Sequence, residues 1–266
     1  MEKRVSRFTQ IKVYTQKNFR VFSNEKGWKT FISAALITIL ISMVTGEEMF
    51  YTYQATQKGC FAVMSACIWI GIFNSIRSIC RERDILKREH RTGLHMSAYV
   101  AARLCYEAVI CLAEAMIVTV LIWIANWGHF IEGGVILPAI IELFFTFFLI
   151  ILASDGLGMV ISSVVKSENT AMTVMPFALI IQLVMSGMLF ELSGVTKAVS
   201  ILTISRWGLN ALLSVAHVDD MTFLVPDDYV STPGNLLFLW LLLIGFVLLY
   251  TILSIVALEF IDNDKR

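Results

Sequence analysis

Long apolar runs separated by short polar stretches dominate the hydropathy pattern of this 266-residue chain. A bilayer core about 30 Å thick is crossed by about 20 helical residues. Unpaired backbone groups are too costly in hydrocarbon for runs of this length to be anything other than helical. The pattern therefore predicts six transmembrane helices, in residues 28–44, 59–76, 97–125, 135–165, 170–190 and 236–261.

A soluble helical bundle is the alternative to a membrane protein. It requires a polar face that recurs about every 3.6 residues, and the run "LLFLWLLLIGFVLLYTILSIVAL" at 236–258 has none. The composition agrees, since 57% of residues are hydrophobic, 16% are charged and the mean hydropathy is +0.74. We expect an all-α membrane protein with one domain, residues 1–266, whose six-helix bundle covers 28–261.

Basic residues predict the orientation of this bundle. Seventeen Lys and Arg side chains fall on the side of the two termini and three on the other, with Arg103 placed at the inner end of the third helix. Because cytoplasmic loops carry the excess of Lys and Arg, we expect a multi-pass protein of the cell membrane with both termini in the cytoplasm. The opposite side is acidic, through Glu47, Glu48, Glu132, Asp219, Asp220, Asp227 and Asp228.

The segment 1–27 is predicted to be a helix lying on the inner leaflet. Phe8, Ile11, Phe19 and Phe22 share one sector of a helical wheel, and Lys17, Arg20 and Arg7 fall elsewhere, whereas Lys12 and Val21 break the pattern. An amphipathic helix of this kind binds the interface between acyl chains and anionic headgroups. A disordered basic tail is the alternative.

No motif for nucleotide or metal chemistry accompanies the helices. The sequence holds no G-x-x-x-x-G-K-[ST] and no pair of nucleophile and base. Its five cysteines lie in or beside apolar runs with no metal-binding spacing, so we interpret them as packing residues. We expect that this chain is not an enzyme and holds no metal or cofactor. It would then either take energy from a partner or let solutes move down their concentration gradient.

The stretch "ERDILKREH" at 82–90 is unusually charged for so apolar a chain. A cytoplasmic loop explains its basic residues, but not the interleaved Glu82, Asp84 and Glu89. A short helix that carries both signs of charge can make several charge-assisted hydrogen bonds to a protein partner. We therefore interpret the stretch as a docking surface; a solvated loop is the alternative.

Residues 82–107 resemble the loop between the second and third helices of type-2 ATP-binding-cassette (ABC) permeases, the G subfamily in particular. Those proteins carry E-R-x-x-x-x-R-E, then a glycine, a segment of small polar residues and Tyr, and K/R-x-x-x-E/D. The matching positions are Glu82, Arg83, Arg88, Glu89, Gly93, Ser97, Tyr99, Arg103 and Glu107, with one residue fewer than usual between Gly93 and Tyr99.

A second resemblance lies at 175–190, "MPFALIIQLVMSGMLF", and 204–213, "ISRWGLNALL". These are similar to the end of the family's fifth helix and its membrane-dipping outer segment. Ser205, Arg206 and Trp207 occupy that pattern, with Trp where the family commonly has Tyr.

The resemblance implies a cytoplasmic coupling helix at 81–93, an elbow helix at 1–27 and an outer re-entrant segment at 191–234. The coupling residues it assigns are Glu82, Arg83, Asp84, Lys87, Arg88 and Glu89. It also implies a permease that exports solutes by alternating access, paired with a second copy or a paralogue. ABC ATPase subunits, which bind ATP and Mg, would drive it; membrane lipid is a further partner and nucleic acid is not.

By resemblance, the translocation path lies between two permease copies and is lined by the second and fifth helices. Our candidates are Trp69, Phe73, Asn74, Gln182, Met185 and Met188. Aromatic and Met side chains on membrane helices also serve simply as packing residues, which is the alternative for each of them.

Several charged residues fall inside the predicted spans: Arg103, Glu107, Glu114, Glu142 and Asp155. A carboxylate at this depth costs about 3 kcal/mol and tends to face the bundle or a cavity. Arg103 and Glu107 are four apart and can pair. Glu114 could be protonated, paired across helices or exposed to a solute path, and Asp155 in "ASDGLG" could serve local packing.

Two other classes of function remain open from the sequence. One is an ATP-independent channel or secondary transporter, for which we would expect midplane charge pairs, broken helices or inverted repeats. The other is a non-transporting membrane anchor or assembly partner, which would not need the long outer segment.

Overall fold

A computed structural model describes residues 6–46, 49–131, 133–222 and 229–260, and within these ranges the chain forms only helices and loops. The predicted acidic positions Glu47, Glu48, Glu132, Asp227 and Asp228 lie outside the described residues. The helices are α1 (Arg7–Asn24), α2 (Lys29–Thr45), α3 (Tyr53–Ser75), α4 (Ser78–Arg91), α5 (Met96–Ala125), α6 (Ala139–Val164), α7 (Glu168–Val184), α8 (Val195–Ser200), α9 (Ile204–Val215), the 3-10 turn η2 (Val218–Asp220) and α10 (Pro233–Glu259).

The prediction of an all-helical membrane protein is confirmed. By length and composition, four helical segments can cross a membrane: Tyr53–Arg91, Met96–Ala125, Ala139–Val164 and Pro233–Glu259. A fifth is possible because α1 and α2 together pass the same test, although they are bent by 71° where they meet. Helix α7 is a shorter apolar helix of 17 residues that contains Pro176. Each of the six predicted runs contains a helix, although α6 begins at Ala139 rather than 135 and α7 ends at Val184 rather than 190. Whether each of them crosses the bilayer stays a prediction.

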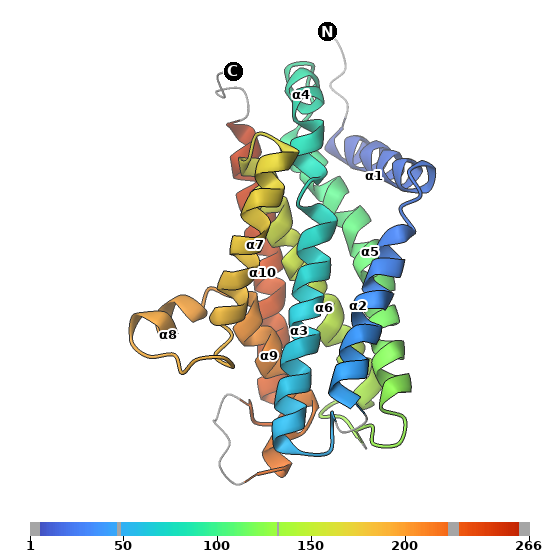
Figure 1. The fold of residues 1–266 in the computed structure, drawn as a ribbon. Coiled ribbons are helices and arrows are strands. Elements are labelled where there is room, and N and C mark those ends of the chain that lie inside the picture. The colour runs from blue at the N-terminus through green and yellow to red at the C-terminus, as the bar shows by residue number, and fades with distance from the viewer. Residues whose placement is uncertain (1–5, 47–48, 132, 223–228, 261–266) are drawn as a thin grey trace.

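Helix α6 occupies the centre of the bundle. It is apolar all round and lies against α3, α5 and α10, as expected for a helix with no face turned to solvent. Figure 1 shows these long helices side by side, with α1 running across one end of them. That end also holds α4 and the last turn of α10, whereas the start of α3 and η2 lie at the opposite end (Figure 1).

Glycines allow α3 and α6 to approach closely. A Cβ added to Gly71 on α3 would collide with the carbonyl oxygen of Ile151 and lie 2.8 Å from the Ser154 Cβ. A Cβ added to Gly158 on α6 would collide with the hydroxyl of Ser75 on α3. Small residues at such crossings let membrane helices pack backbone to backbone.

Helix α1 packs on α5 through aromatic side chains. The rings of Phe19 and Phe22 lie 5.2 Å and 6.1 Å from the ring of Tyr106, centroid to centroid. Phe8, from the same predicted apolar sector, is 83% exposed. Part of the apolar sector of α1 therefore contacts the bundle, and part of it is open to the surroundings.

Candidate functional site

The acidic residues of α4 hold α1 and α5 in place. The Tyr14 hydroxyl on α1 donates a hydrogen bond of 2.6 Å to Glu89, and burial together with this bond raises the pKa of Tyr14 above its ordinary value. Glu82 accepts a hydrogen bond of 3.2 Å from the Tyr99 hydroxyl and lies 3.3 Å from the Lys17 ammonium. The two carboxylates thus connect three helices at one end of the molecule.

Further contacts close the same joint. The Gln10 side chain donates to the carbonyl of Gly93, 3.2 Å away, and accepts from the backbone N–H of His95 at 3.1 Å. Both terminal nitrogens of Arg81 donate to the carboxylate of Glu25, at 3.1 Å and 3.2 Å. The contacts that α1 and Glu25 make with α4, with the turn after α4 and with α5 are together called the α1–α4 joint.

Arg83 and Ser162 fasten α4 to the end of α6. The buried Arg83 guanidinium donates to the carbonyls of Ser163 and Val165, at 2.7 Å and 3.1 Å. The Ser162 hydroxyl accepts the backbone N–H groups of Ile79 and Cys80, at 3.0 Å and 3.1 Å, at the start of α4. These bonds satisfy N–H groups that a helix start leaves unpaired.

One face of α4 remains exposed. Its residues recur at helical spacing and are Arg81, Asp84, Ile85, Arg88 and Arg91, of which the apolar Ile85 is 42% exposed. We call them the outward face of α4. Of the six predicted coupling residues, Asp84 and Arg88 lie on this face, whereas Glu82, Arg83 and Glu89 point into the molecule. Lys87 is half-buried.

The bundle interior contains the predicted intramembrane charges. Arg103 and Glu107 form an ion pair of 2.9 Å within α5. The Asn74 amide on α3 donates a hydrogen bond of 2.7 Å to Glu114 on α5, so Glu114 has a cross-helix partner. Asp155 on α6 is fully buried, and its backbone carbonyl accepts a hydrogen bond of 2.6 Å from the Ser75 hydroxyl.

Glu142 has a different role at the opposite end of α6. Its buried carboxylate accepts three backbone N–H groups of the preceding loop, from Val135 at 2.9 Å, Ile136 at 2.5 Å and Leu137 at 2.7 Å. It therefore holds that loop in a tight turn against the start of α6. The sequence showed the charge, but not that the loop folds back onto it.

The predicted path residues do not form one surface in a single chain. Trp69 on α3 is 48% exposed, Asn74 is bonded to Glu114, and Phe73 is partly buried against the core. Gln182 is buried, and its side chain accepts the backbone N–H of Ser205 at 3.1 Å. Met188 packs against the core, and Met185 is half-buried just after α7 ends.

Ser205, Arg206 and Trp207 lie in the first turn of α9. Ser205 bonds to Gln182 of α7, and the other two connect α9 to the end of α8. The Arg206 guanidinium donates to the hydroxyl of Ser200, 2.8 Å away, and lies over the Trp207 ring. The indole N–H of Trp207 donates to the carbonyl of Ile201 at 2.8 Å. These residues brace the short helix that extends sideways from the bundle in Figure 1.

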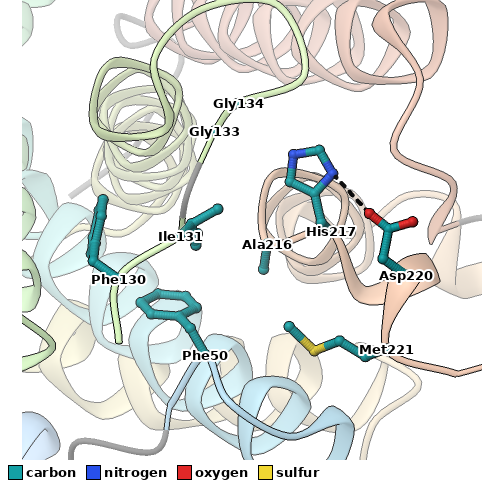
Figure 2. A pocket seen from close by; sticks show the side chains of 9 residues that line it. All are labelled: Phe50, Phe130, Ile131, Gly133, Gly134, Ala216, His217, Asp220 and Met221. Atoms are coloured by element: carbon teal, nitrogen blue, oxygen red, sulfur yellow. Dashed lines mark ion pairs between the residues drawn. The ribbon is translucent and has the colours of Figure 1, made fainter. Parts of the chain in front are cut away.

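A cavity of about 440 Å³ lies beside η2, and the sequence did not indicate it. Figure 2 shows Phe50 and Phe130 on one side of it and His217 with Asp220 on the other. The His217 ring nitrogen lies 3.7 Å from the Asp220 carboxylate. In the sequence, the sign of this cavity was a histidine followed closely by two aspartates. That pattern alone does not predict a cavity, because the opposite wall comes from the distant loop between α5 and α6.

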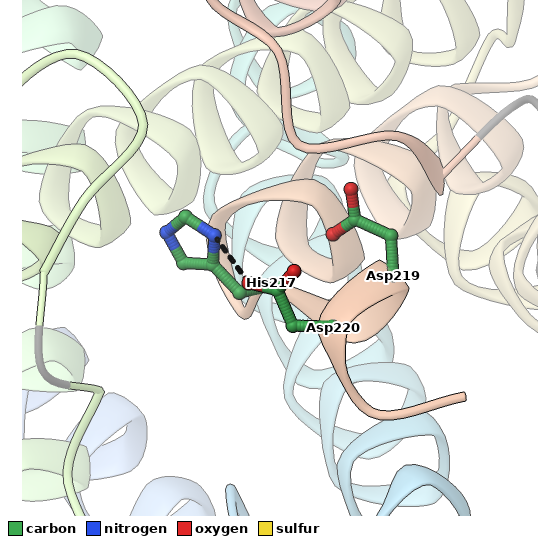
Figure 3. Close-up of side chains that lie close together, drawn as sticks. All are labelled: His217, Asp219 and Asp220. Atoms are coloured by element: carbon green, nitrogen blue, oxygen red, sulfur yellow. Dashed lines mark ion pairs between the residues drawn. The ribbon is translucent and has the colours of Figure 1, made fainter. Parts of the chain in front are cut away.

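His217, Asp219 and Asp220 bring their possible ligand atoms within 4.8 Å of one another. Figure 3 shows the three side chains around the same turn. Asp219 accepts both the backbone N–H and the hydroxyl of Ser231, and Asp220 is 82% exposed. Asp219 thus connects η2 to the residues before α10, which is a structural role.

Comparisons with known proteins agree with this arrangement. The family model described as "ABC-2 type transporter" matches residues 9–216, from α1 to the end of α9. The ABC transporter ATP-binding/permease protein Rv1747 of Mycobacterium tuberculosis is 28% identical over 228 residues, which are 80% of this chain and 26% of that protein. The chain thus spans about a quarter of the length of this relative. With its apolar helices, charged α4 and matching family model, the chain belongs to the ABC-2 type transporter family, as a membrane permease domain.

Proposed function

We propose that this chain is the permease subunit of an ATP-driven ABC exporter, and that separate ATPase subunits dock on the outward face of α4. The single observation that carries the proposal is that the two faces of α4 have different surroundings. One face is fixed to α1, α5 and α6 through Glu82, Arg83 and Glu89. The opposite face is exposed and accessible to a protein partner, although Arg81 on it also pairs with Glu25.

This geometry suits a coupling helix. When a partner pushes on the outward face, α4 moves together with α1, α5 and α6, because its opposite side is bonded to these three helices. The motion is transmitted to α6 through Arg83 and to α1 through Glu89. The exposed Ile85 supplies an apolar anchor between charged residues, an arrangement common at interface centres.

In this proposal α1 is the elbow helix and α2, α3, α5, α6, α7 and α10 are six membrane spans. The basic residues support cytoplasmic termini, since nine of the 21 Lys and Arg side chains lie on α1 and α4, which are at the same end of the bundle. Helices α2 and α7 are short but apolar, and a 17-residue helix is at the lower limit for crossing a bilayer.

Two copies of the permease would form the translocation path. Helix α7 has few neighbours within the chain, and its apolar side chains Phe177, Ile180 and Ile181 are more than half exposed. Beside it a groove of about 420 Å³ between α2, α3 and α7 is lined by apolar residues that include Trp69. A second copy or a paralogue would cover this side and complete a path from Trp69, Asn74, Gln182 and the nearby Met residues.

The partner ATPase is supported by the relative. Its printed name joins an ATP-binding and a permease function in one protein, whereas no nucleotide-binding motif occurs in the 266 residues of this chain. ATP and Mg would therefore bind the ATPase. A channel, a secondary transporter or an anchor needs no such partner.

The test is purification from native membranes in mild detergent, followed by identification of associated proteins and measurement of vanadate-sensitive ATP hydrolysis. We expect an ABC ATPase in near-equal amount to the permease, and hydrolysis that elutes with the complex. An assembled permease that elutes without any ATPase and without hydrolysis would contradict the proposal and favour a channel, secondary transporter or anchor.

A further inference from the structure

Three acidic side chains and one arginine lie together in the bundle between α5 and α6. We call Glu107, Glu114 and Asp155 the acid cluster. All three are buried in segments long and apolar enough to cross a membrane. Asp155 is under the electrostatic influence of Glu107, Arg103 and Glu114, so the group forms one electrostatic unit.

The charges in this unit do not balance. Arg103 lies 2.9 Å from Glu107 and compensates it. Glu114 and Asp155 remain, and the described groups facing them supply no second cation. These groups are Cys67 and Asn74 on α3, Arg103, Tyr106 and Cys111 on α5, and Tyr250 of α10 packed against Gly156 next to Asp155. Two uncompensated negative charges at this depth carry a large desolvation cost.

Few hydrogen bonds stabilise the two charges. Glu114 accepts one bond from Asn74, and its other oxygen has no partner among the described residues. Neither carboxylate oxygen of Asp155 accepts a hydrogen bond of ordinary geometry in the described part of the chain. The Ser75 hydroxyl lies near this carboxyl group but donates to the backbone carbonyl of Asp155. Ionised carboxylates in folded proteins are found with donors around them.

A bound metal ion fits this site poorly. Among the described residues, the group of His, Cys, Asp and Glu side chains close enough to share a metal is His217, Asp219 and Asp220, which includes no member of the acid cluster. The carboxylate oxygens of the acid cluster are not all within 4.8 Å of one another. The neighbouring Cys67 and Cys111 are fully buried packing residues. A proton does not require several ligand atoms close together, since each carboxyl group can bind one by itself.

We propose that Glu114 and Asp155 form a proton-binding site inside the bundle, occupied in this arrangement of the helices. The proton on Glu114 resides on the oxygen that Asn74 does not contact, and Arg103 pairs with Glu107. The site is sealed where α3 packs closely on α6 at Gly71. Helix motions that separate α3 from α5 would break the bond between Asn74 and Glu114, admit water and release the proton. This inference does not depend on ATP coupling or on export.

Infrared spectroscopy of the purified protein in lipid nanodiscs tests the site directly, through the carbonyl band of protonated carboxyl groups. We expect the band to lose the intensity of one group in Glu114→Gln, one in Asp155→Asn, and both in the double variant. Glu191→Gln is the control, since it removes an exposed acid outside the cluster and should leave the band unchanged. A double variant that keeps the full band would overturn the proposal.

Thermal unfolding provides the second measurement and covers the case of variants that fold poorly. Neutral amides resemble protonated acids, so Glu114→Gln and Asp155→Asn should keep a Tm close to that of the unchanged protein. Glu107→Gln leaves Arg103 buried without its counter-ion and should lower the Tm the most. If the first two variants unfold or fail to assemble while Glu107→Gln remains stable, the two carboxylates are ionised and the proposal is wrong.

Discussion

At the scale of single residues, each buried acid has its own surroundings and therefore its own role. Glu142 accepts three backbone N–H groups, Glu107 pairs with Arg103, and Glu114 is bonded to Asn74. In the sequence these residues looked alike, as charges inside apolar runs. Of their partners, the sequence predicted only Arg103, because it lies one helical turn away on the same helix. The partners of Glu142 and Glu114 come from a loop and from another helix.

Replacing Glu142 by Ala should destabilise the fold. The change leaves the N–H groups of Val135, Ile136 and Leu137 without their acceptor. A buried donor without a partner costs about 1–3 kcal/mol, so we expect a loss of about 3 kcal/mol or more and a clearly lower Tm in detergent. Glu142→Gln keeps one acceptor oxygen and should lie in between.

The control for this change is Glu191→Ala, which removes an exposed acid from the loop that follows α7. Its Tm should stay within about 1 °C of the unchanged protein, because exposed substitutions alter stability by about 0.5 kcal/mol or less. Equal Tm values for Glu142→Ala and Glu191→Ala would show that the loop does not depend on the carboxylate.

At the scale of the elements, the α1–α4 joint depends on a small number of bonds that can be tested one at a time. Tyr14→Phe removes the hydroxyl that donates to Glu89. One such bond contributes about 1 kcal/mol, so the amides of α1 should exchange hydrogen about fivefold faster, while those of α6 do not change. Tyr51→Phe, an exposed tyrosine at the opposite end, is the control. Unchanged exchange in α1 would mean that the bond does not hold the helix.

The close packing of α3 on α6 gives a second prediction at this scale. Gly71→Ala places a methyl group against the Ile151 carbonyl and should push the helices apart, with a loss of about 1–3 kcal/mol in the unfolding free energy. Gly245→Ala on α10 is matched in chemistry, but nothing lies within 4 Å of its added Cβ. It should be neutral or stabilising by about 0.5–1 kcal/mol, since Ala favours helices. A Tm for Gly71→Ala equal to that of Gly245→Ala would argue against backbone contact between α3 and α6.

The elements were largely predictable and their contacts largely were not. Long apolar runs identify helices because hydrocarbon permits little else, and each of the six runs contains a helix. The interleaved acids of α4 suggested docking to a partner, yet Glu82 and Glu89 bind α1 and α5. The sequence could not separate these roles, because Tyr14 and Lys17 lie more than 60 residues away from the acids they contact.

At the scale of the whole molecule, α4 is a short helix at one end of the bundle that is bonded to the bundle on one side and exposed on the other. Helix α4 is bonded to α1, α5 and α6 on one side, and its outward face carries Arg81, Asp84, Ile85, Arg88 and Arg91. A partner bound there would act on the packed core through α6, the helix with the most buried side chains. Family membership was predictable from the residues around α4, whereas the pairing of two copies is still a proposal.

The measurement that tests ATP coupling most directly is the amount of ATPase recovered with the permease. The charge-reversed double variant Asp84→Lys/Arg88→Glu alters the outward face and leaves Glu82, Arg83 and Glu89 untouched; Lys58→Glu reverses an exposed charge on α3 at the opposite end of the bundle. We predict that the double variant folds with an unchanged Tm and recovers at least tenfold less ATPase, whereas Lys58→Glu recovers the full amount. A folded double variant that retains the full amount of ATPase and its vanadate-sensitive hydrolysis would contradict docking on α4.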